Sequence, residues 1–363
     1  MKEIKVQLGA RSYTVFVGKE TLPLLGQHLN DLVRDDRAVV ITVSEVDALY
    51  GAAVRKSLLD CGIAPEVVHV ADREDAKTLA AYSGVVGKLL EIKAGRGALI
   101  IALGGGCVGD LAGFVAATYM RGIRLIHVPT TLLAQVDSSI GGKTALNLPD
   151  AKNIIGVFHQ PSFVLSDVAV LKTLPPREVR CGVAEMIKYG AIMDLPLLDY
   201  LELERDAILG LKEDETINAV CKAVELKAGV VTKDETESSG IRTLLNFGHT
   251  IGHAVEAAMG YKGCSHGEAV AVGMVGEMRL AEAIGIASSE DLERLEALVS
   301  SFGLPTRLRG IDPGKIIALM AYDKKVDARK LRFALPNGLG NGAVVSDPPR
   351  EAIIKALKEV TSN

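Results

Sequence analysis

Residues 97–110 have the sequence GALIIALGGGCVGD, in which a short apolar run leads directly into a glycine-rich turn. The apolar run at 97–103 is typical of a buried strand, and the turn stands where a helix would begin. Around this segment, strand patterns at 37–43 and 64–70 alternate with helical patterns at 47–59 and 76–92. Because strands that alternate with helices form a parallel sheet covered by helices, we predict an α/β fold for this half of the chain.

The character of the sequence changes at Leu174-Pro175-Pro176. Long helical patterns follow, at 178–193, 197–211, 215–233, 250–259, 268–284 and 289–302. The next strand pattern begins only at residue 331. A length of 363 residues also favours two hydrophobic cores over one. We therefore predict an α/β domain at residues 1–175 and a mostly α-helical domain at residues 176–363.

Composition and charge exclude several classes of protein. Hydrophobic residues make up 48% of the chain and charged residues 24%, which excludes intrinsic disorder for most of its length. The net charge of −4 provides no general attraction for nucleic acid. The longest apolar stretch, near 98–103, is far shorter than the roughly 20 residues needed to cross a bilayer. We expect neither a nucleic-acid partner nor a membrane partner.

The cysteines and the N-terminal residues indicate the compartment. The five cysteines are odd in number and no two form a C-x-x-C pair, which argues against a disulfide framework or a thiolate zinc site. The first residues, MKEIKVQLGARSY, contain no apolar segment like that of a signal peptide. A cytoplasmic location is therefore expected.

The GGGCVGD turn at 104–110 is the first candidate site. Glycines allow a phosphate to approach the backbone, and the free N–H groups at the start of a helix bind anions. The turn lacks the G-K-[ST] ending of a Walker loop, and it does not follow the first strand, as a common dinucleotide fingerprint does. A tight strand-to-helix turn without a ligand is the alternative, and these residues alone leave both interpretations open.

A second candidate is VDSSIGGKT at 136–144, with Lys152-Asn153 shortly after it. Backbone N–H groups of such a small, polar loop can hold an oxyanion while the lysines supply positive charge. An exposed flexible loop with solvated lysines is the alternative. The apolar flanks at 126–133 and 154–158 argue against a freely exposed loop and favour a site.

The histidines provide the strongest indication of chemistry. Three of the seven, His249, His253 and His266, fall within 18 residues. His249 and His253 are four residues apart, so a helix places both on one face. Histidine nitrogens suit zinc, with a carboxylate as a common third ligand. The sequence is not H-E-x-x-H, which excludes that metalloprotease motif. We predict a metal site or an acid–base site.

Charged residues of the helical half are ambiguous on their own. Glu185 and Lys188 lie among apolar neighbours, where a buried charge needs a partner or a metal. An ion pair on an ordinary amphipathic helix is the alternative. Lys227, Arg242 and the sequence DKK at 323–325 are cations that matter only if the fold brings them together.

Taken in order, these motifs resemble the 3-dehydroquinate synthase family of the sugar-phosphate cyclase superfamily. The resemblance runs from the GGGCVGD turn through VDSSIGGKT, Lys152-Asn153, AEMIK at 184–188, NFGHTIGH at 246–253 and HGE at 266–268 to DKK at 323–325. It implies a Rossmann-like NAD domain followed by a helical metal domain, with the active site in the cleft between them.

The resemblance also implies three sets of site residues. The ligands of one divalent metal ion, zinc or cobalt, would be Glu185, His249 and His266. The NAD contacts would be Asp72, Glu74, Lys77, Gly106, Cys107, Val108, Gly109, Asp110, Thr130, Thr131, Lys143, Lys152, Val170, Leu171, Lys172 and Thr173. The catalytic and substrate contacts would be His253, Lys143, Asp137, Asn153, Lys188, Lys227, Arg242, Asn246, Arg121 and either Lys324 or Lys325, with Lys325 preferred.

The implied activity is that of a lyase of the shikimate pathway. It converts 3-deoxy-D-arabino-heptulosonate 7-phosphate, a phosphorylated sugar acid, into 3-dehydroquinate and phosphate. The steps would be transient oxidation by NAD, elimination of phosphate, re-reduction and an intramolecular aldol closure. Because Arg121 matches an arginine that reaches the neighbouring subunit's site, a homodimer is expected. His253 would lie near the departing phosphate.

One departure and three alternatives accompany this hypothesis. Arg73 stands where the family has a glycine, so the adenosine-side loop is expected to differ. Another sugar-phosphate cyclase is one alternative, but its substrate lacks the carboxylate that Arg242 and Lys227 would bind. A metal-dependent polyol dehydrogenase is a second, although it needs no phosphate-binding set. A nucleotide-binding regulatory protein is a third, and the metal triad argues against it.

Overall fold

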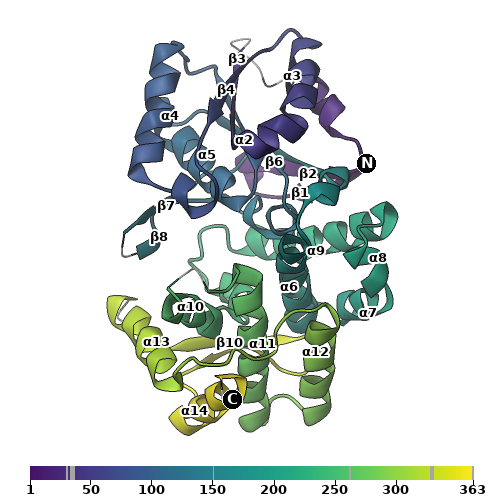
Figure 1. Cartoon of the computed structure of the whole chain (residues 1–363), viewed down its shortest axis with the longest axis vertical. Helices are drawn as coiled ribbons and strands as arrows, with labels where there is room; N and C mark the ends of the chain where they lie inside the picture. Colours follow the sequence, from purple (N-terminus) through teal and green to yellow (C-terminus); the bar gives the residue numbers. More distant parts are fainter. Residues whose placement is uncertain (30–31, 33–36, 150, 261–262, 328–330, 362–363) are drawn as a thin grey trace. The chain divides into compact units, whose positions relative to one another are not determined.

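The structure is a computed structural model of the whole chain (Figure 1). It describes all residues except 30–31, 33–36, 150, 261–262, 328–330 and 362–363, and it does not describe the side chains of 321–327. The chain forms two compact units. Unit 1 comprises Met1–Pro175 and Thr216–Thr236, and unit 2 comprises Pro176–Glu215 and Glu237–Asn363. Residues 216–236, which the helical pattern predicted in the second domain, therefore pack with the first.

Unit 1 is built on a seven-stranded sheet in the order β1-β2-β9-β6-β5-β3-β4. The strands are β1 (Lys2–Val6), β2 (Tyr13–Gly18), β3 (Arg37–Thr42), β4 (Ala64–His69), β5 (Leu99–Gly104), β6 (Arg124–Pro129) and β9 (Phe163–Asp167). Among the described residues of this sheet, only the β1–β2 pair is antiparallel. All six residues of β5 are buried, as expected of an apolar run in a parallel sheet. The predicted α/β fold is confirmed.

The helices of unit 1 connect its strands or follow them in the chain. They are α1 (Leu25–Leu29), α2 (Ser44–Val46), α3 (Ala52–Leu59), α4 (Leu79–Glu91), α5 (Gly106–Thr118) and α9 (Glu213–Lys233), of which α9 begins in unit 2. α5 packs on β5 and β6, and its apolar face joins the core around Ile100 and Leu125. The strands β7 (Lys143–Leu148) and β8 (Ala151–Phe158) form a separate two-stranded hairpin beside α5.

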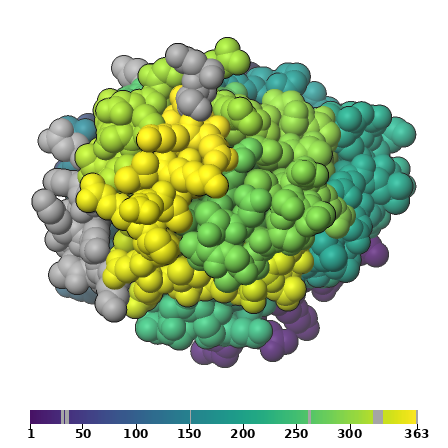
Figure 2. Space-filling view, turned by 90° about the horizontal axis from the view of Figure 1, so that it is seen from below, coloured from purple at the N-terminus to yellow at the C-terminus, as the bar shows by residue number. Residues whose placement is uncertain are grey.

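Unit 2 is a bundle of helices around α11 (His266–Ala283). The other helices are α6 (Pro176–Met193), α7 (Leu195–Leu203), α8 (Arg205–Leu209), α10 (His249–Ala258), α12 (Ser289–Ser301), α13 (Pro313–Asp327) and α14 (Arg350–Thr361). α6, α10, α12 and α14 all contact α11. The C-terminal residues, yellow in Figure 2, form part of the surface of this unit. The predicted helical domain is confirmed.

One local detail of unit 2 differs from the helical patterns, whereas the strand predicted from residue 331 is present as β10. The pattern at 197–211 is two helices, α7 and α8, because Glu204 leaves the helical conformation with φ −99° and ψ 19°. β10 (Arg332–Pro336) pairs with β11 (Gly342–Ser346) in an antiparallel hairpin. Among the described residues, no helix has both the length and the apolar character that a membrane span requires.

Asp167, at the end of β9, ties several turns of unit 1 together. Its buried carboxylate accepts hydrogen bonds from the backbone N–H groups of Glu20, Thr21 and Leu22, at 2.9, 2.6 and 3.1 Å. It also accepts one from Ala169 at 3.0 Å. Removing the carboxylate would leave these donors without their acceptor in the interior.

We therefore expect Asp167→Ala to lower the free energy of unfolding by roughly 3 kcal/mol. The matched control is Asp60→Ala, because Asp60 is exposed and pairs only across one helical turn with Lys56. That change should cost about 0.5 kcal/mol or less. Chemical denaturation of both variants measures the difference, and equal losses would contradict the anchoring role of Asp167.

Candidate active site

Three helices of unit 2 bring Glu185, His249 and His266 together. Glu185 lies in the middle of α6, and the two histidines are the first residues of α10 and α11. The Nε2 atoms of His249 and His266 each lie 3.4 Å from Oε1 of Glu185. One ligand atom from each residue lies within 4.8 Å of the other two, so the three could hold a metal ion. Sequence reasoning named the same three residues.

Neighbouring oxygen atoms fix the orientation of both imidazole rings. Nδ1 of His249 lies 3.1 Å from the carbonyl oxygen of Phe247, and Nδ1 of His266 lies 3.4 Å from Oε2 of Glu256. An oxygen acceptor at Nδ1 favours the tautomer with the proton there, which leaves the lone pair on Nε2. Both Nε2 atoms therefore suit metal coordination on the side of Glu185.

The electrostatic environments of the two histidines differ. Burial lowers the pKa of His249 to about 3, with Glu185 opposing the shift and Lys188 adding to it. Burial also disfavours the charged form of His266, but hydrogen bonds to Glu185 and Glu256 prevail and raise its pKa to about 10. Two carboxylates facing one ring stabilise positive charge, and a metal cation would supply that charge when bound.

Lys188 lies one helical turn after Glu185 on α6. Its ammonium group forms an ion pair with the Glu185 carboxylate and lies 4.6 Å from the centre of the Tyr189 ring. The ion pair of the alternative interpretation is present, but both of its charged side chains are almost completely buried. Burying two charges is unfavourable unless their geometry is good, which is typical of functional sites.

The other predicted site residues of unit 2 are His253, Arg242, Asn246 and a lysine at 324 or 325. His253 is exposed one turn after His249, with ring centres 5.2 Å apart, and it forms a second possible ligand group with Glu256 and His266. Arg242 is buried in the 3₁₀ segment Ile241–Asn246, with Nε 3.5 Å from Oε1 of Glu237. Asn246 is exposed. The side chains of Lys324 and Lys325 lie outside the described residues.

In unit 1, the glycine-rich turn joins β5 to α5. Gly105 precedes the helix and provides no side-chain cap. A Cβ atom on Gly106 would lie 2.8 Å from Oγ of Ser138, and one on Gly105 would lie 3.1 Å from Cγ2 of Thr131. Only glycine fits against these neighbours without a shift, and the open helix N-terminus is suited to a phosphate. Cys107, Val108, Gly109 and Asp110 form the first turn of α5.

A network of charged and polar groups lies beside this turn. Lys77 donates to Oδ2 of Asp110 at 2.6 Å and to Oδ1 of Asn153. Lys152 donates to Oε1 of Glu74 at 2.9 Å. Burial disfavours the charged form of Lys77, but Asp110 outweighs this effect and the pKa of Lys77 is raised. The structure thus brings four predicted NAD contacts and one predicted substrate contact into one network.

Lys227 joins the loop at 136–144 although it is far away in sequence. Its buried ammonium group lies 2.6 Å from both the carbonyl oxygen and Oδ1 of Asp137. In the sequence Lys227 is only a scattered cation, and packing of α9 in unit 1 places it here. Lys143 is exposed at the start of β7.

The other predicted contacts of unit 1 lie on loops and short 3₁₀ segments. Thr130 and Thr131 follow β6, with Thr130 N–H bonded to Gly104 O at 3.0 Å. Val170, Leu171, Lys172 and Thr173 belong to the 3₁₀ segment Val168–Thr173. Asp72 and Arg121 are exposed. Met120 and Arg121 have left-handed backbone, with φ of 52° and 66°, a conformation that costs free energy and clusters at functional positions.

Sequence reasoning missed two carboxylates: Glu256, which contacts His266, and Glu277, which accepts a hydrogen bond at the start of α10. Glu256 follows His253 by three residues, so helical spacing could have placed it on the same face. Glu277 is a single carboxylate in the apolar, small-residue stretch AVGMVGEM, which is itself an indication of a buried role. Both are buried in the structure.

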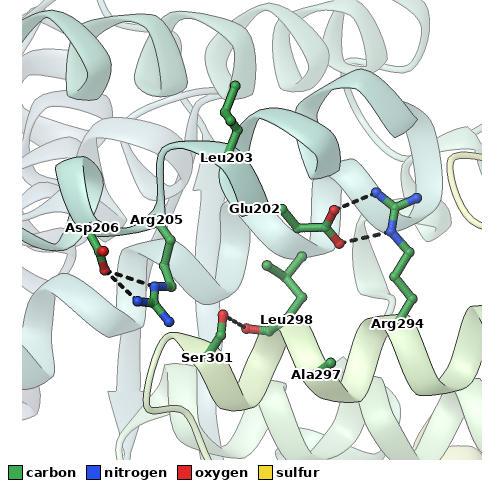
Figure 3. Close-up of a pocket in the computed structure, with 8 residues that line it drawn as sticks. All are labelled: Glu202, Leu203, Arg205, Asp206, Arg294, Ala297, Leu298 and Ser301. Carbon is green, nitrogen blue, oxygen red and sulfur yellow. Dashed lines mark hydrogen bonds and ion pairs between the residues drawn. The ribbon is translucent and has the colours of Figure 1, made fainter.

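A hollow of about 380 Å³ lies elsewhere in unit 2, between α7, α8 and α12 (Figure 3). It is lined by Glu202, Leu203, Arg205, Asp206, Arg294, Ala297, Leu298 and Ser301. Its arginines are already engaged, Arg294 with Glu202 and Asp199 and Arg205 with Asp206. It contains none of the predicted site residues.

Comparison with known proteins gives matches along nearly the whole chain. Residues 67–181 match the 3-dehydroquinate synthase N-terminal family and residues 182–326 the 3-dehydroquinate synthase C-terminal family. A 3-dehydroquinate synthase of Caulobacter vibrioides is 43% identical over 366 aligned residues, which cover 99% of each chain.

Solved structures show the same two-part fold. A 2-deoxy-scyllo-inosose synthase complexed with carbaglucose-6-phosphate, NAD+ and Co2+ has a TM-score of 0.87 and 27% identity, covering 99% of this chain and 100% of its own. A 2-epi-5-epi-valiolone synthase of Streptomyces hygroscopicus, with NAD+ and Zn2+ bound, has a TM-score of 0.88 and 27% identity, covering 99% and 98%. Together with the family matches, these similarities establish that the chain belongs to the 3-dehydroquinate synthase family.

Proposed function

We propose that this enzyme converts 3-deoxy-D-arabino-heptulosonate 7-phosphate into 3-dehydroquinate and phosphate, as a lyase of the shikimate pathway. The observation that carries the proposal is the convergence of Glu185, His249 and His266 in a chain that matches the family over nearly its full length. None of the five cysteines, all of which the structure describes, forms a disulfide, which supports a cytoplasmic location.

The donor set of unit 2 fits a divalent metal ion. One carboxylate and two imidazole nitrogens form the usual catalytic zinc set, and they leave a position open for substrate. Zinc or cobalt would be held by Glu185, His249 and His266, consistent with the metals named for the two solved relatives. When bound, the metal would polarise hydroxyl groups of the substrate.

The glycine turn of unit 1 fits the phosphates of a dinucleotide. Thr131 and Ser138 leave room only for glycine at positions 105 and 106, and the start of α5, which has no side-chain cap, is suited to bind an anion. Lys77, Asp110, Glu74 and Lys152 would bind the ribose and phosphate groups. NAD would supply transient oxidation of the substrate, with the hydride returned before product leaves.

In this proposal, charged and polar side chains hold the substrate. Asp137, Lys143, Asn153 and Lys227 of unit 1 would bind hydroxyl and phosphate oxygens. In unit 2, Lys188 and Asn246 would do the same, together with a lysine at 324 or 325. Their main contribution is position and charge, because the phosphate is a dianion that must be fixed before it leaves.

Two groups of unit 2 have more specific proposed roles. Arg242 would bind the substrate carboxylate, since a guanidinium binds carboxylate through two parallel hydrogen bonds. This contact distinguishes the proposed substrate from those of sister cyclases, which lack the carboxylate. His253 would serve as a proton-transferring group near the departing phosphate.

We expect the protein to release phosphate from the heptulosonate phosphate over many turnovers with NAD+ far below the substrate concentration. NADH absorbance should not accumulate, because the hydride returns to the same molecule. A sugar phosphate without the carboxylate, such as sedoheptulose 7-phosphate, should react at least about tenfold more slowly in kcat/KM, the value of one lost charged hydrogen bond.

Two outcomes of this assay would each identify one of the alternative activities. Stoichiometric accumulation of NADH would identify a dehydrogenase, and preferential turnover of the sugar phosphate without the carboxylate would identify a sister cyclase. Phosphate release and absorbance at the NADH band, followed in the same sample, separate the three cases.

Removing the metal should abolish activity, and zinc or cobalt should restore it. Metal polarisation is worth several kcal/mol, so loss of about three orders of magnitude in kcat is expected. His266→Ala should bind no metal at micromolar concentration, whereas His69→Ala, a control at an exposed histidine of unit 1, should bind normally. Full activity in an exhaustively metal-free sample would contradict the metal assignment.

We further propose a homodimer in which Arg121 completes the partner's site. Arg121 is exposed on strained left-handed backbone, which suits a role beyond its own unit. The hairpin strand β8 exposes the apolar side chains of Ile154, Val157 and Phe158 at 58, 42 and 38%. A small exposed apolar sheet of this kind is stabilised by a protein partner.

Mixing two inactive variants tests this arrangement. Arg121→Ala and His266→Ala should each be inactive, but subunit exchange should form heterodimers in which one of the two sites is complete. Random pairing predicts about a quarter of the wild-type phosphate release. If Arg121 acts within its own chain, no activity returns, and light scattering would show whether dimers formed.

A further inference from the structure

The helix α10, which begins with His249, has no side-chain cap of its own. The first N–H groups of a helix lack partners within the helix, and Ser, Thr, Asp or Asn at the preceding position usually accepts from them. Here that position is Gly248, in left-handed conformation with φ +79°. A Cβ atom on Gly248 would lie 2.8 Å from Val270 O and 2.5 Å from the Met274 side chain, so no capping side chain fits there.

Glu277 of α11 provides this cap from the neighbouring helix. Its Oε2 accepts a hydrogen bond from Gly248 N–H at 2.7 Å, and its Oε1 accepts one from Ile251 N–H at 3.0 Å. The Glu277 side chain is fully buried. Burial raises the pKa of Glu277 to about 8, while these backbone donors favour the charged form. A carboxylate at this end of a helix also complements the helix dipole.

Close packing of the two helices makes this reach possible. A Cβ atom on Gly273 of α11 would collide with the carbonyl oxygen of Gly248, so α11 approaches α10 at backbone contact. Glu277 follows Gly273 by four residues and therefore lies on the same face of α11. Gly273 of α11 and Gly248 at the start of α10 allow the two backbones to approach this closely.

The two backbone groups that Glu277 holds are on either side of His249. Gly248 precedes this histidine and Ile251 follows it by two residues, so the carboxyl group fixes the turn from which the imidazole extends. His266 is the first residue of α11 itself. The helix α11 thus carries one proposed metal ligand, His266, and also Glu277, which holds the backbone around the other histidine ligand, His249.

We propose that Glu277 is a positioning residue of the metal centre, which holds His249 in the orientation that metal binding requires. This inference rests on the proposed metal site. Glu277 does not touch the donor atoms, and its effect passes through the backbone of Gly248 and Ile251. Without the cap, the first turn of α10 would fray and His249 would have to be ordered at the moment of binding, which weakens affinity.

The test is Glu277→Gln, which keeps the size of the side chain but replaces one acceptor oxygen by an NH2 group. Titration of the metal-free protein with Co2+ should show a 10- to 100-fold weaker dissociation constant and an altered visible absorption spectrum. Glu282→Gln, the same substitution further along α11, should leave both unchanged. Leu295→Ala, in the buried face of α12, controls for a general loss of stability.

Hydrogen exchange provides a second measurement, which needs no metal. In the metal-free wild-type protein, the amides of Gly248 and Ile251 should be protected. In Glu277→Gln they should exchange at least about tenfold faster, whereas Leu295→Ala should not single them out. If Glu277→Gln does not fold, the wild-type protein alone tests the proposal. Protected amides at Gly248 and Ile251 would support it, and unprotected amides would overturn it.

The outcomes separate this inference from the proposed function. If the wild-type protein binds no Co2+, the metal proposal fails and the role of Glu277 fails with it. If the wild type binds Co2+ and Glu277→Gln binds it with the same affinity and spectrum, only the role of Glu277 is overturned. Weaker binding by Glu277→Gln and Leu295→Ala alike would likewise overturn it, since a general structural role would then suffice.

Discussion

A carboxylate buried in the middle of α6 constrains the architecture of unit 2. Glu185 has no exposed surface, and a buried charge must meet positive groups or a metal. Lys188 supplies one such group from the same helix, and the imidazoles of His249 and His266 approach from two others. The helices α6, α10 and α11 therefore meet at the Glu185 side chain, and the bundle around α11 holds them in this arrangement.

Both units bury charge in pairs, and both contain a close approach that only glycine allows. In unit 1, Lys77 and Asp110 lie next to the turn at Gly105 and Gly106. In unit 2, Glu185 and Lys188 belong to the same bundle as the close approach of α10 and α11 at Gly248. Charged groups held away from water interact strongly and lose little entropy when a ligand arrives.

Much of this could be predicted from local pattern. The apolar run at 99–103 meets two covering layers in any α/β sheet, so its burial followed from composition alone. The spacing of His249 and His253 is enough to place both on one face of a helix. The patterns failed at Glu204, where a break between α7 and α8 has no glycine or proline to mark it. They also failed for residues 216–236, because helical periodicity does not say which core a helix joins.

Residue type and spacing along the chain establish the fold class and the clustering of three histidines, and the motifs establish the family resemblance, which implies the metal ligands. They do so because local geometry translates spacing directly into strands, helices and faces. Three other contacts depend on how the helices and loops pack: Lys227 meets Asp137, Lys77 joins Asn153, and Glu277 caps the helix of His249. These contacts join residues 29 to 90 positions apart, and the packing of whole helices, which no local pattern encodes, sets their distances.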